Sequence, residues 1–149
     1  MDKLREGGFL IAKIKQISGR IFNRKLKEHG INDINSAQGR IIFTLWQQDN
    51  MPIKVLSRNT ALGITTLTSM LIRLEKAGYI IRTTDQNDNR QTLISLSKKV
   101  KSILENYENI SKEMTALFYK DLTETQIDDF ENTLRHILLN LVKYEEKIR

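Results

Sequence analysis

A set of short hydroxyl side chains shares one face of a predicted helix, Ile64–Ala77. Leucine and methionine residues recur along this stretch at the spacing of a buried helical stripe. The residues opposite that stripe are Thr65, Thr66, Thr68, Ser69 and Arg73. Threonine and serine are mediocre helix formers, but their hydroxyls can bond to phosphates or bases, and their small size lets a helix enter the major groove. This face favours DNA contact, with Arg73 on backbone or base, although alone it fits an ordinary exposed surface equally well.

A second candidate group lies on a loop between two predicted strands, residues 79–84 and 91–96, which are rich in β-branched and aromatic residues. Arg90, at the end of this loop, could enter a minor groove, where negative potential is strongest in narrow A·T tracts. Asp88, two residues earlier, could hold it extended through a charge-assisted hydrogen bond. The plainer interpretation is an exposed ion pair that contributes little.

A shorter helix, Ile53–Thr60, is predicted before these elements, with Pro52 at its first helical position. Gly78 is expected to end the second helix as its C′ residue. Further phosphate or wing-base contacts are expected from Lys54, Arg58 and Arg82. Two helices followed by a hairpin over residues 50–97 predict a winged helix-turn-helix, in which the second helix is the recognition helix and the hairpin is the wing.

Four other helices are predicted around this part, at about 4–29, 35–48, 98–120 and 123–148. Capping-box residues begin the helices at 35–48 and 123–148, and Ser97 is a candidate N-cap for the helix at 98–120. The helix at 35–48 is so apolar that we expect it to be buried between two others, with Trp46 in the core.

The outer helices are too apolar on one side for one small winged helix. We therefore expect a single mainly α domain over residues 1–149, with residues 1–30 and 98–149 forming a helical dimerisation part. A two-fold homodimer would place two recognition helices about one DNA turn apart, over a pseudo-palindromic operator.

Charge is unevenly distributed along the 149 residues, whose net charge is +6. Residues 1–49 carry a net +4 and residues 50–101 a net +6, from nine basic and three acidic side chains, whereas residues 102–149 carry −4. A polyanion would be drawn to the first two thirds, and this segregation favours nucleic acid over a merely soluble lysine-rich surface. No apolar run is long enough for a membrane span and no secretory signal is visible, so we expect a cytoplasmic protein without a membrane partner.

Nearly the whole chain resembles the MarR family of bacterial and archaeal transcriptional regulators, most sharply from Leu56 to Ser97. The resemblance rests on four motifs in order. They are the Thr/Ser-rich start of the recognition helix, the segment Leu74-Glu75-Lys76-Ala77-Gly78 that ends this helix, the wing motif Asp88-Asn89-Arg90, and Leu96-Ser97 before the next helix. It implies a homodimer that binds its own or neighbouring promoters and is released by a phenolic or other amphipathic small molecule. Gln91 stands where many relatives carry a second wing arginine. The absence of cysteine removes the peroxide-sensing subgroup, and no histidine–carboxylate cluster suggests a metal sensor.

The favoured function is sequence-specific regulation of transcription. We expect a homodimeric repressor that binds double-stranded DNA. Its effector pocket would involve the first two helices and the fifth, with walls at Ile14, Phe43 and Trp46. An enzyme is not expected, since the chain offers no catalytic serine motif, phosphate loop or metal-ligand spacing, and no cofactor is expected. The alternative is a winged-helix adaptor that binds protein instead of DNA, but the recognition-helix face carries only Ile72 as an apolar anchor.

Overall fold

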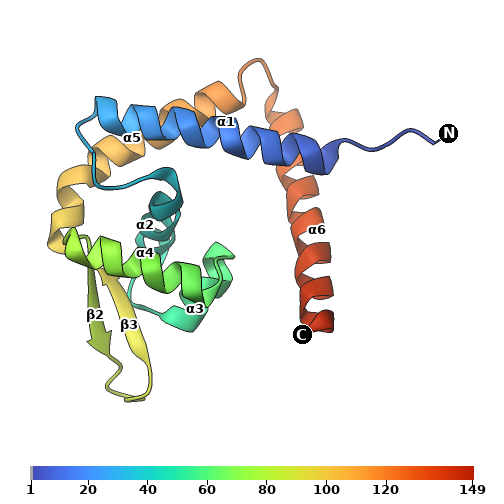
Figure 1. Ribbon diagram of the computed structural model, residues 1–149. Helices are drawn as coiled ribbons and strands as arrows, with labels where there is room; N and C mark the ends of the chain where they lie inside the picture. The colour runs from blue at the N-terminus through green and yellow to red at the C-terminus, as the bar shows by residue number, and fades with distance from the viewer. Residues whose placement is uncertain (1) are drawn as a thin grey trace. The chain divides into compact units, whose positions relative to one another are not determined.

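The computed structural model describes residues 2–149, which form a mainly α-helical chain with one small sheet, as predicted (Figure 1). The helices are α1 (Gly7–Glu28), α2 (Ser36–Gln47), α3 (Ile53–Thr60), α4 (Ile64–Lys76), α5 (Lys101–Phe118) and α6 (Glu124–Ile148), with a 3-10 turn at Lys98–Val100. The strands are β1 (Met51–Pro52), β2 (Ile80–Thr84) and β3 (Thr92–Leu96). Within the described residues no helix is both long and apolar enough to cross a membrane.

The sheet is antiparallel, with strand order β1-β3-β2. In the hairpin, Ile80 pairs with Leu96 and Thr84 with Thr92. The two-residue strand β1, where Met51 pairs with Ile94, was not predicted from the sequence. It anchors the start of α3 to the wing, and Pro52 is therefore the last strand residue and the N-cap of α3, not its first helical residue.

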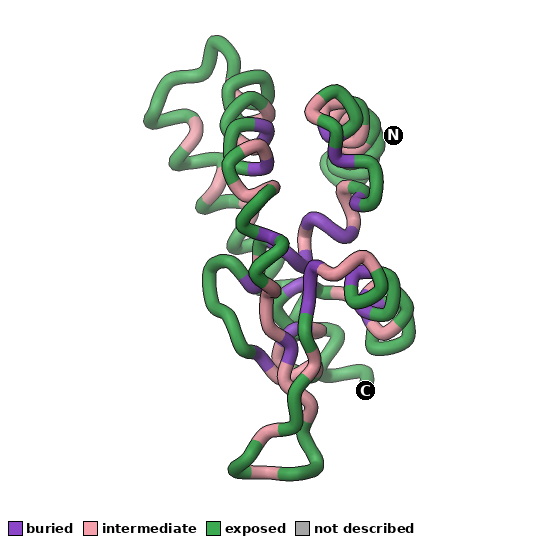
Figure 2. Tube along the Cα trace, turned by 90° about the vertical axis from the view of Figure 1, so that its left-hand side faces the viewer, coloured by how far each residue is buried: buried purple, intermediate pink, exposed green. Residues whose placement is uncertain are grey.

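The chain divides into two compact units, residues 1–112 and 113–149. The core of the first unit draws on all of its helices and on the sheet (Figure 2). Its largest fully buried side chains are Leu26, Ile41, Ile42, Leu45, Met51, Leu56, Leu67, Leu71, Leu74, Ile94, Val100 and Ile110. The buried side of α4 packs against α3 and β2, which holds the two helices and the wing together.

Helix ends follow the sequence closely. Both predicted capping boxes form: the side chains of Asn35 and Gln38 bond reciprocally to each other's backbone N–H, and those of Thr123 and Gln126 do the same. Gly78 adopts φ +86°, the left-handed conformation expected after α4. Ser97 is an exception, since its hydroxyl donates to the carbonyl of Gly78 and does not cap a helix.

The expected burial of α2 is only partly correct. Ile41, Ile42 and Leu45 are fully buried, but Trp46 is 40% exposed and Phe43 is 45% exposed. The prediction that Trp46 lies in the core is therefore wrong for the single chain. The sequence shows that this helix is apolar on more than one side, and the fold of one chain covers only one of those sides.

The second unit contains the end of α5 and all of α6. Phe118, Tyr119 and Phe130 form an aromatic cluster with ring centroids 5.0–6.2 Å apart, and Tyr119 donates a hydrogen bond of 2.6 Å to Glu131. This bond and burial raise the pKa of Tyr119. No residue of α6 is fully buried, so its apolar side chains remain available for a further contact.

Candidate nucleic-acid interface

The candidate recognition helix is α4, which buries one side completely and presents the other to solvent. Leu67, Leu71 and Leu74 are 0% exposed. Four of the predicted contact residues lie on the exposed side, and Thr68 is half-buried at its edge. The exposed four are Thr65, Thr66, Ser69 and Arg73. The accessible face of the helix thus offers three hydroxyls and a guanidinium beside the exposed Ile64 and Ile72, and such polar groups can contact bases in a DNA groove.

The turn before α4 is held by side-chain hydroxyls. Ala61 adopts φ +60°, and Thr60, although buried, donates to the carbonyl of Leu56 at 2.7 Å and accepts from the N–H of Leu62 at 3.3 Å. Ser57 donates to the carbonyl of Leu62 at 2.6 Å. These bonds satisfy the backbone groups that the break between α3 and α4 leaves open, and they fix the angle between the two helices.

The predicted phosphate contacts on α3 are accessible: Lys54 and Arg58 are both exposed. Arg58 lies in the last turn of α3, next to the turn that leads into α4. Cations beside a recognition helix are placed to meet the backbone phosphates that flank a groove.

The wing places Arg90 at an exposed tip. Its side chain is 92% exposed, and Asp88 Oδ1 accepts from its backbone N–H at 3.1 Å and its Nε at 3.3 Å. Asp85 accepts from the N–H of Asn87 at 2.9 Å, and the N–H of Asp85 donates to the carbonyl of Gln91 at 3.0 Å. The loop is therefore ordered by its own aspartates, and the predicted Asp88–Arg90 contact forms.

Arg82 is placed differently from the other predicted contacts. Its side chain is only 26% exposed, and its Nε lies 3.4 Å from Glu75 Oε1, close enough for an ion pair but without hydrogen-bond geometry. The pair ties β2 to the last turn of α4. Arg82 thus has a structural contact that its sequence position did not reveal.

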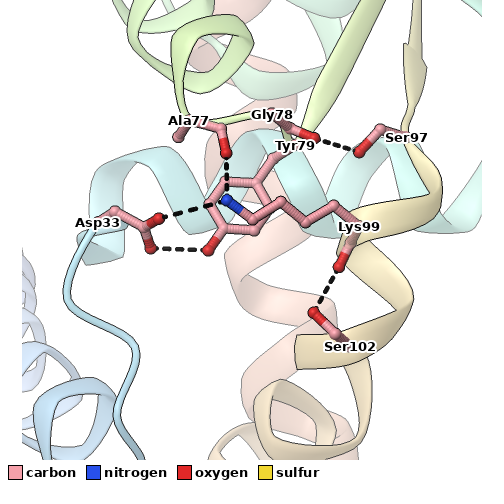
Figure 3. A network of polar contacts seen from close by, with 7 residues as sticks. All are labelled: Asp33, Ala77, Gly78, Tyr79, Ser97, Lys99 and Ser102. Atoms are coloured by element: carbon pink, nitrogen blue, oxygen red, sulfur yellow. Dashed lines mark hydrogen bonds and ion pairs between the residues drawn. The ribbon is translucent and has the colours of Figure 1, made fainter.

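The base of the wing is joined to the loop between α1 and α2 by a polar network (Figure 3). The Tyr79 hydroxyl donates to Asp33 Oδ1 at 2.7 Å, and Lys99 Nζ lies 4.0 Å from Asp33 Oδ2. Lys99 also donates to the carbonyl of Ala77 at 2.5 Å and stacks over the Tyr79 ring at 4.7 Å. Burial, followed by the bond to Asp33, raises the pKa of Tyr79, so the phenol remains a donor throughout the physiological range.

The sequence did not indicate this network. Asp33, Tyr79 and Lys99 belong to three separate segments, and each is an ordinary residue for its position. The only local signal was Gly78, whose left-handed conformation turns the chain so that Tyr79 can reach the loop.

The predicted walls of an effector pocket are all exposed in the single chain. Ile14 on α1 is 43% exposed, and Phe43 and Trp46 on α2 are exposed to a similar degree. The structure instead forms a cavity at the other end of these helices, around Asn23, Gln38 and Arg73. Across residues 2–149 no cluster of histidine and carboxylate side chains could hold a metal ion.

Known proteins resemble this chain in sequence and in fold. The model of the MarR family matches residues 34–92. The HTH-type transcriptional regulator SarZ of Staphylococcus haemolyticus is 29% identical over 119 residues, which are 80% of this chain and 78% of that protein. A MarR transcriptional regulator from Methanosarcina mazei Go1 matches with a TM-score of 0.80 at 21% identity, over 92% of this chain and 96% of that one. A mutant MarR from E. coli complexed with operator DNA matches with a TM-score of 0.78 at 24% identity, over 92% of this chain and 99% of that one.

Proposed function

The chain belongs to the MarR family and is a DNA-binding transcriptional regulator, and from this premise we propose that it is a homodimeric repressor of the operators it recognises. In this proposal α4 enters the major groove and the wing reaches the adjacent minor groove. Residues 50–97 are the DNA-binding part, and residues 1–30 and 98–149 form the dimerisation part in the cytoplasmic protein.

One observation carries the DNA-binding geometry: the hydroxyl face of α4 and the wing arginine are exposed while the opposite side of α4 is fully buried. Thr65, Thr66 and Ser69 would read base edges, with Thr68 at the edge of the contact and Arg73 on base or backbone. Lys54 and Arg58 would meet phosphates, Arg90 would enter the minor groove with Asp88 behind it, and Arg82 would support the wing base. The likeness to MarR solved with operator DNA supports this assignment.

Release by a small molecule is the second part of the proposal. A ligand that binds one spacing of the two recognition helices better than another would shift the dimer away from its DNA-binding state. Ile14, Phe43 and Trp46 expose apolar surface that an amphipathic ligand could cover, and we propose them as walls of its site in the assembled protein.

Selection of bound fragments from random duplex DNA tests the function. The recovered sequence should be a pseudo-palindrome, and fluorescence anisotropy should show that affinity falls steeply between about 50 mM and 200 mM salt. A regulator keeps its preference for the recovered site over a scrambled duplex at both salt concentrations. A protein that binds no duplex even in dilute salt would be the winged-helix adaptor, and the proposal would fail.

A further inference from the structure

A cavity of about 310 Å³ lies in the first unit, away from the predicted effector walls. It is bounded by the end of α1, the loop before α2, the first turn of α2 and the C-terminal half of α4. Its polar lining includes Asn23, Lys27, Asp33, Asn35, Gln38 and Arg73. Its volume is at the lower end of the range for small-molecule sites.

The amide oxygens of three lining residues are already engaged. Asn23 Oδ1 accepts from the N–H of Ser36 at 2.7 Å, Asn35 Oδ1 accepts from the N–H of Gln38 at 2.9 Å, and Gln38 Oε1 accepts from the N–H of Asn35 at 3.0 Å. An amide side chain whose oxygen is engaged keeps its NH₂ group as a donor. Three such donors therefore border the cavity. The backbone N–H groups of Ser36 and Gln38 in the first turn of α2 take part in the same bonds, so we build the site on the side chains and not on the helix end.

Asp33 is the one carboxylate in the lining, and its partners are Tyr79 and Lys99 at the base of the wing. Asp33 accepts from the Tyr79 hydroxyl through one oxygen and faces Lys99 through the other, as Figure 3 shows. These partners hold both of its oxygens on the side of the wing base. Asp33 and Lys99 together contribute no net charge.

The two cations that border the cavity have no acidic partner. Neither Lys27 nor Arg73 forms an ion pair with any residue in the described range 2–149, whereas Arg24, one turn from Lys27, pairs with Glu28 at 3.3 Å. The lining therefore offers donors and two cations without an acidic partner, while Asp33 and the amide oxygens of Asn23, Asn35 and Gln38 are already engaged.

We propose that this cavity binds a small phosphate monoester. A phosphoryl group of this kind carries about −1.5 to −2 charges at neutral pH and three strong acceptor oxygens, which match two free cations and three amide donors. A carboxylate offers one charge and two oxygens, so it would leave part of the lining without a partner. The bound group would bridge Lys27 and the loop before α2 to Arg73 on α4.

A regulatory consequence follows, and this step rests on the proposed function. Arg73 is also a candidate DNA contact, and a guanidinium held in the cavity by the phosphate monoester would be less free to reach the operator. Occupancy of the cavity would lower DNA affinity and, by linkage, DNA would lower affinity for the phosphate monoester by the same factor.

The binding step is tested without DNA, by following the side-chain NH₂ signals of Asn23, Asn35 and Gln38 in NMR spectra of the full-length protein. The probes are glycerol 2-phosphate, a monoester, and dimethyl phosphate, a singly charged diester, at constant ionic strength. Glycerol 2-phosphate should shift these signals saturably, and dimethyl phosphate should bind at least about tenfold more weakly because it carries one charge and two free oxygens.

Variants assign the binding to the cavity. Lys27→Gln and Arg73→Gln should each weaken glycerol 2-phosphate binding by about tenfold or more, and Lys27→Arg should restore most of it. Lys15→Gln removes the same charge from an exposed position on the same helix outside the cavity, and it should bind like the wild type. Unchanged backbone spectra establish that each variant is folded.

The outcomes separate this proposal from the proposed function. Absence of a saturable shift, or equal binding by Lys27→Gln and the wild type, would overturn the site whether or not the protein binds DNA. If an operator duplex shifts the same NH₂ signals and glycerol 2-phosphate does not, the cavity is a contact for the DNA backbone and the monoester site is wrong. Monoester binding with no change in operator affinity supports the site and overturns only the competition through Arg73.

Discussion

Gly39 lies directly against the ring of Tyr107, and this contact joins α2 to α5. The Tyr107 hydroxyl donates to the carbonyl of Gly39 at 2.8 Å in a buried position, and Phe22 packs edge-on against the tyrosine ring. A Cβ added at Gly39 would meet Tyr107 Oη at 2.6 Å and a ring carbon at 3.2 Å. We predict that Gly39→Ala lowers the free energy of unfolding by about 1–3 kcal/mol, measured by urea denaturation, because the tyrosine ring is buried against Phe22 and would have to shift.

Gly19 provides the matched control for this substitution. It also lies inside a helix, but a Cβ there would meet only Ser36 Oγ at an ordinary 3.5 Å. Gly19→Ala should therefore stabilise the protein by roughly 0.5–1 kcal/mol through helix propensity. Equal effects of the two substitutions would show that the Gly39–Tyr107 contact does not constrain packing.

Tyr107 should also make stability depend on alkaline pH. Burial raises its pKa to about 12, whereas a tyrosine in an unfolded chain ionises near pH 10. The stabilisation is therefore complete below pH 10 and is lost as the pH rises from 10 to 12, since the unfolded state releases the proton first. Tyr107→Phe should be about 1 kcal/mol less stable than the wild type at pH 7, because it lacks the hydrogen bond to Gly39.

The comparison at alkaline pH isolates the ionisation of this phenol. By pH 11 the wild type should have lost about 1 kcal/mol through Tyr107 alone, so the difference between the two proteins should nearly close. Other tyrosines and lysines titrate equally in both proteins and cancel. A difference that stays constant from pH 7 to pH 11 in urea denaturation would mean that Tyr107 ionises as easily in the folded as in the unfolded state.

At the scale of elements, helices and the hairpin could be predicted because their signals are local. Asn35, Gln38, Thr123 and Gln126 cap their own helices, and the composition of residues 91–96 marks β3. Strand β1 could not be predicted, because two residues carry no periodicity and its pairing with β3 is a contact across more than forty positions. The partner of Asp33, Tyr79, escaped prediction for the same reason, since 46 positions separate the two residues.

The wing gives a prediction about its arginine and the aspartate behind it. Arg90→Ala should weaken operator binding by about 1–3 kcal/mol in fluorescence anisotropy and reduce the preference for A·T pairs under the wing. Asp88→Asn should weaken it by less than about fivefold, because an exposed ion pair adds little to the pose of Arg90.

Arg24 is a matched control for Arg90. Its Nε also lies 3.3 Å from a carboxylate in an exposed pair, but on α1. Arg24→Ala should leave operator affinity close to that of the wild type at about 100 mM salt, where distant surface charges are screened. If Arg24→Ala and Arg90→Ala weaken binding equally, the wing acts only through general charge and does not enter a groove.

At the scale of the whole molecule, the chain has more apolar surface than its own fold covers. Phe9, Leu10 and Ile11 on α1 are 46–68% exposed, and Leu138 and Leu141 on α6 are 57% and 63% exposed. The sequence predicted apolar stripes on these helices, but it could not show which stripes one chain would bury. Exposed stripes of this length are characteristic of surfaces that meet a partner, and they support the proposed homodimer.

This surface gives a prediction about assembly. The wild type should sediment at twice the chain mass of 17.4 kDa. Replacing Leu138 and Leu141 together by aspartate should shift it toward the single-chain mass at micromolar concentration, because burying two carboxylates in an apolar interface costs several kcal/mol. Both side chains are exposed in the single chain, so the helix content by circular dichroism should be unchanged.

Asn140→Asp is the control, since it adds an acidic side chain to the exposed surface of the same helix without removing apolar surface. It should remain dimeric and bind the operator normally. The double aspartate variant should bind a full pseudo-palindrome no better than a half-site, because the avidity of two linked recognition helices is lost while each helix is intact. A wild type that sediments as a single chain, or a double variant that keeps both its mass and its preference for the full site, would remove α6 from the proposed interface.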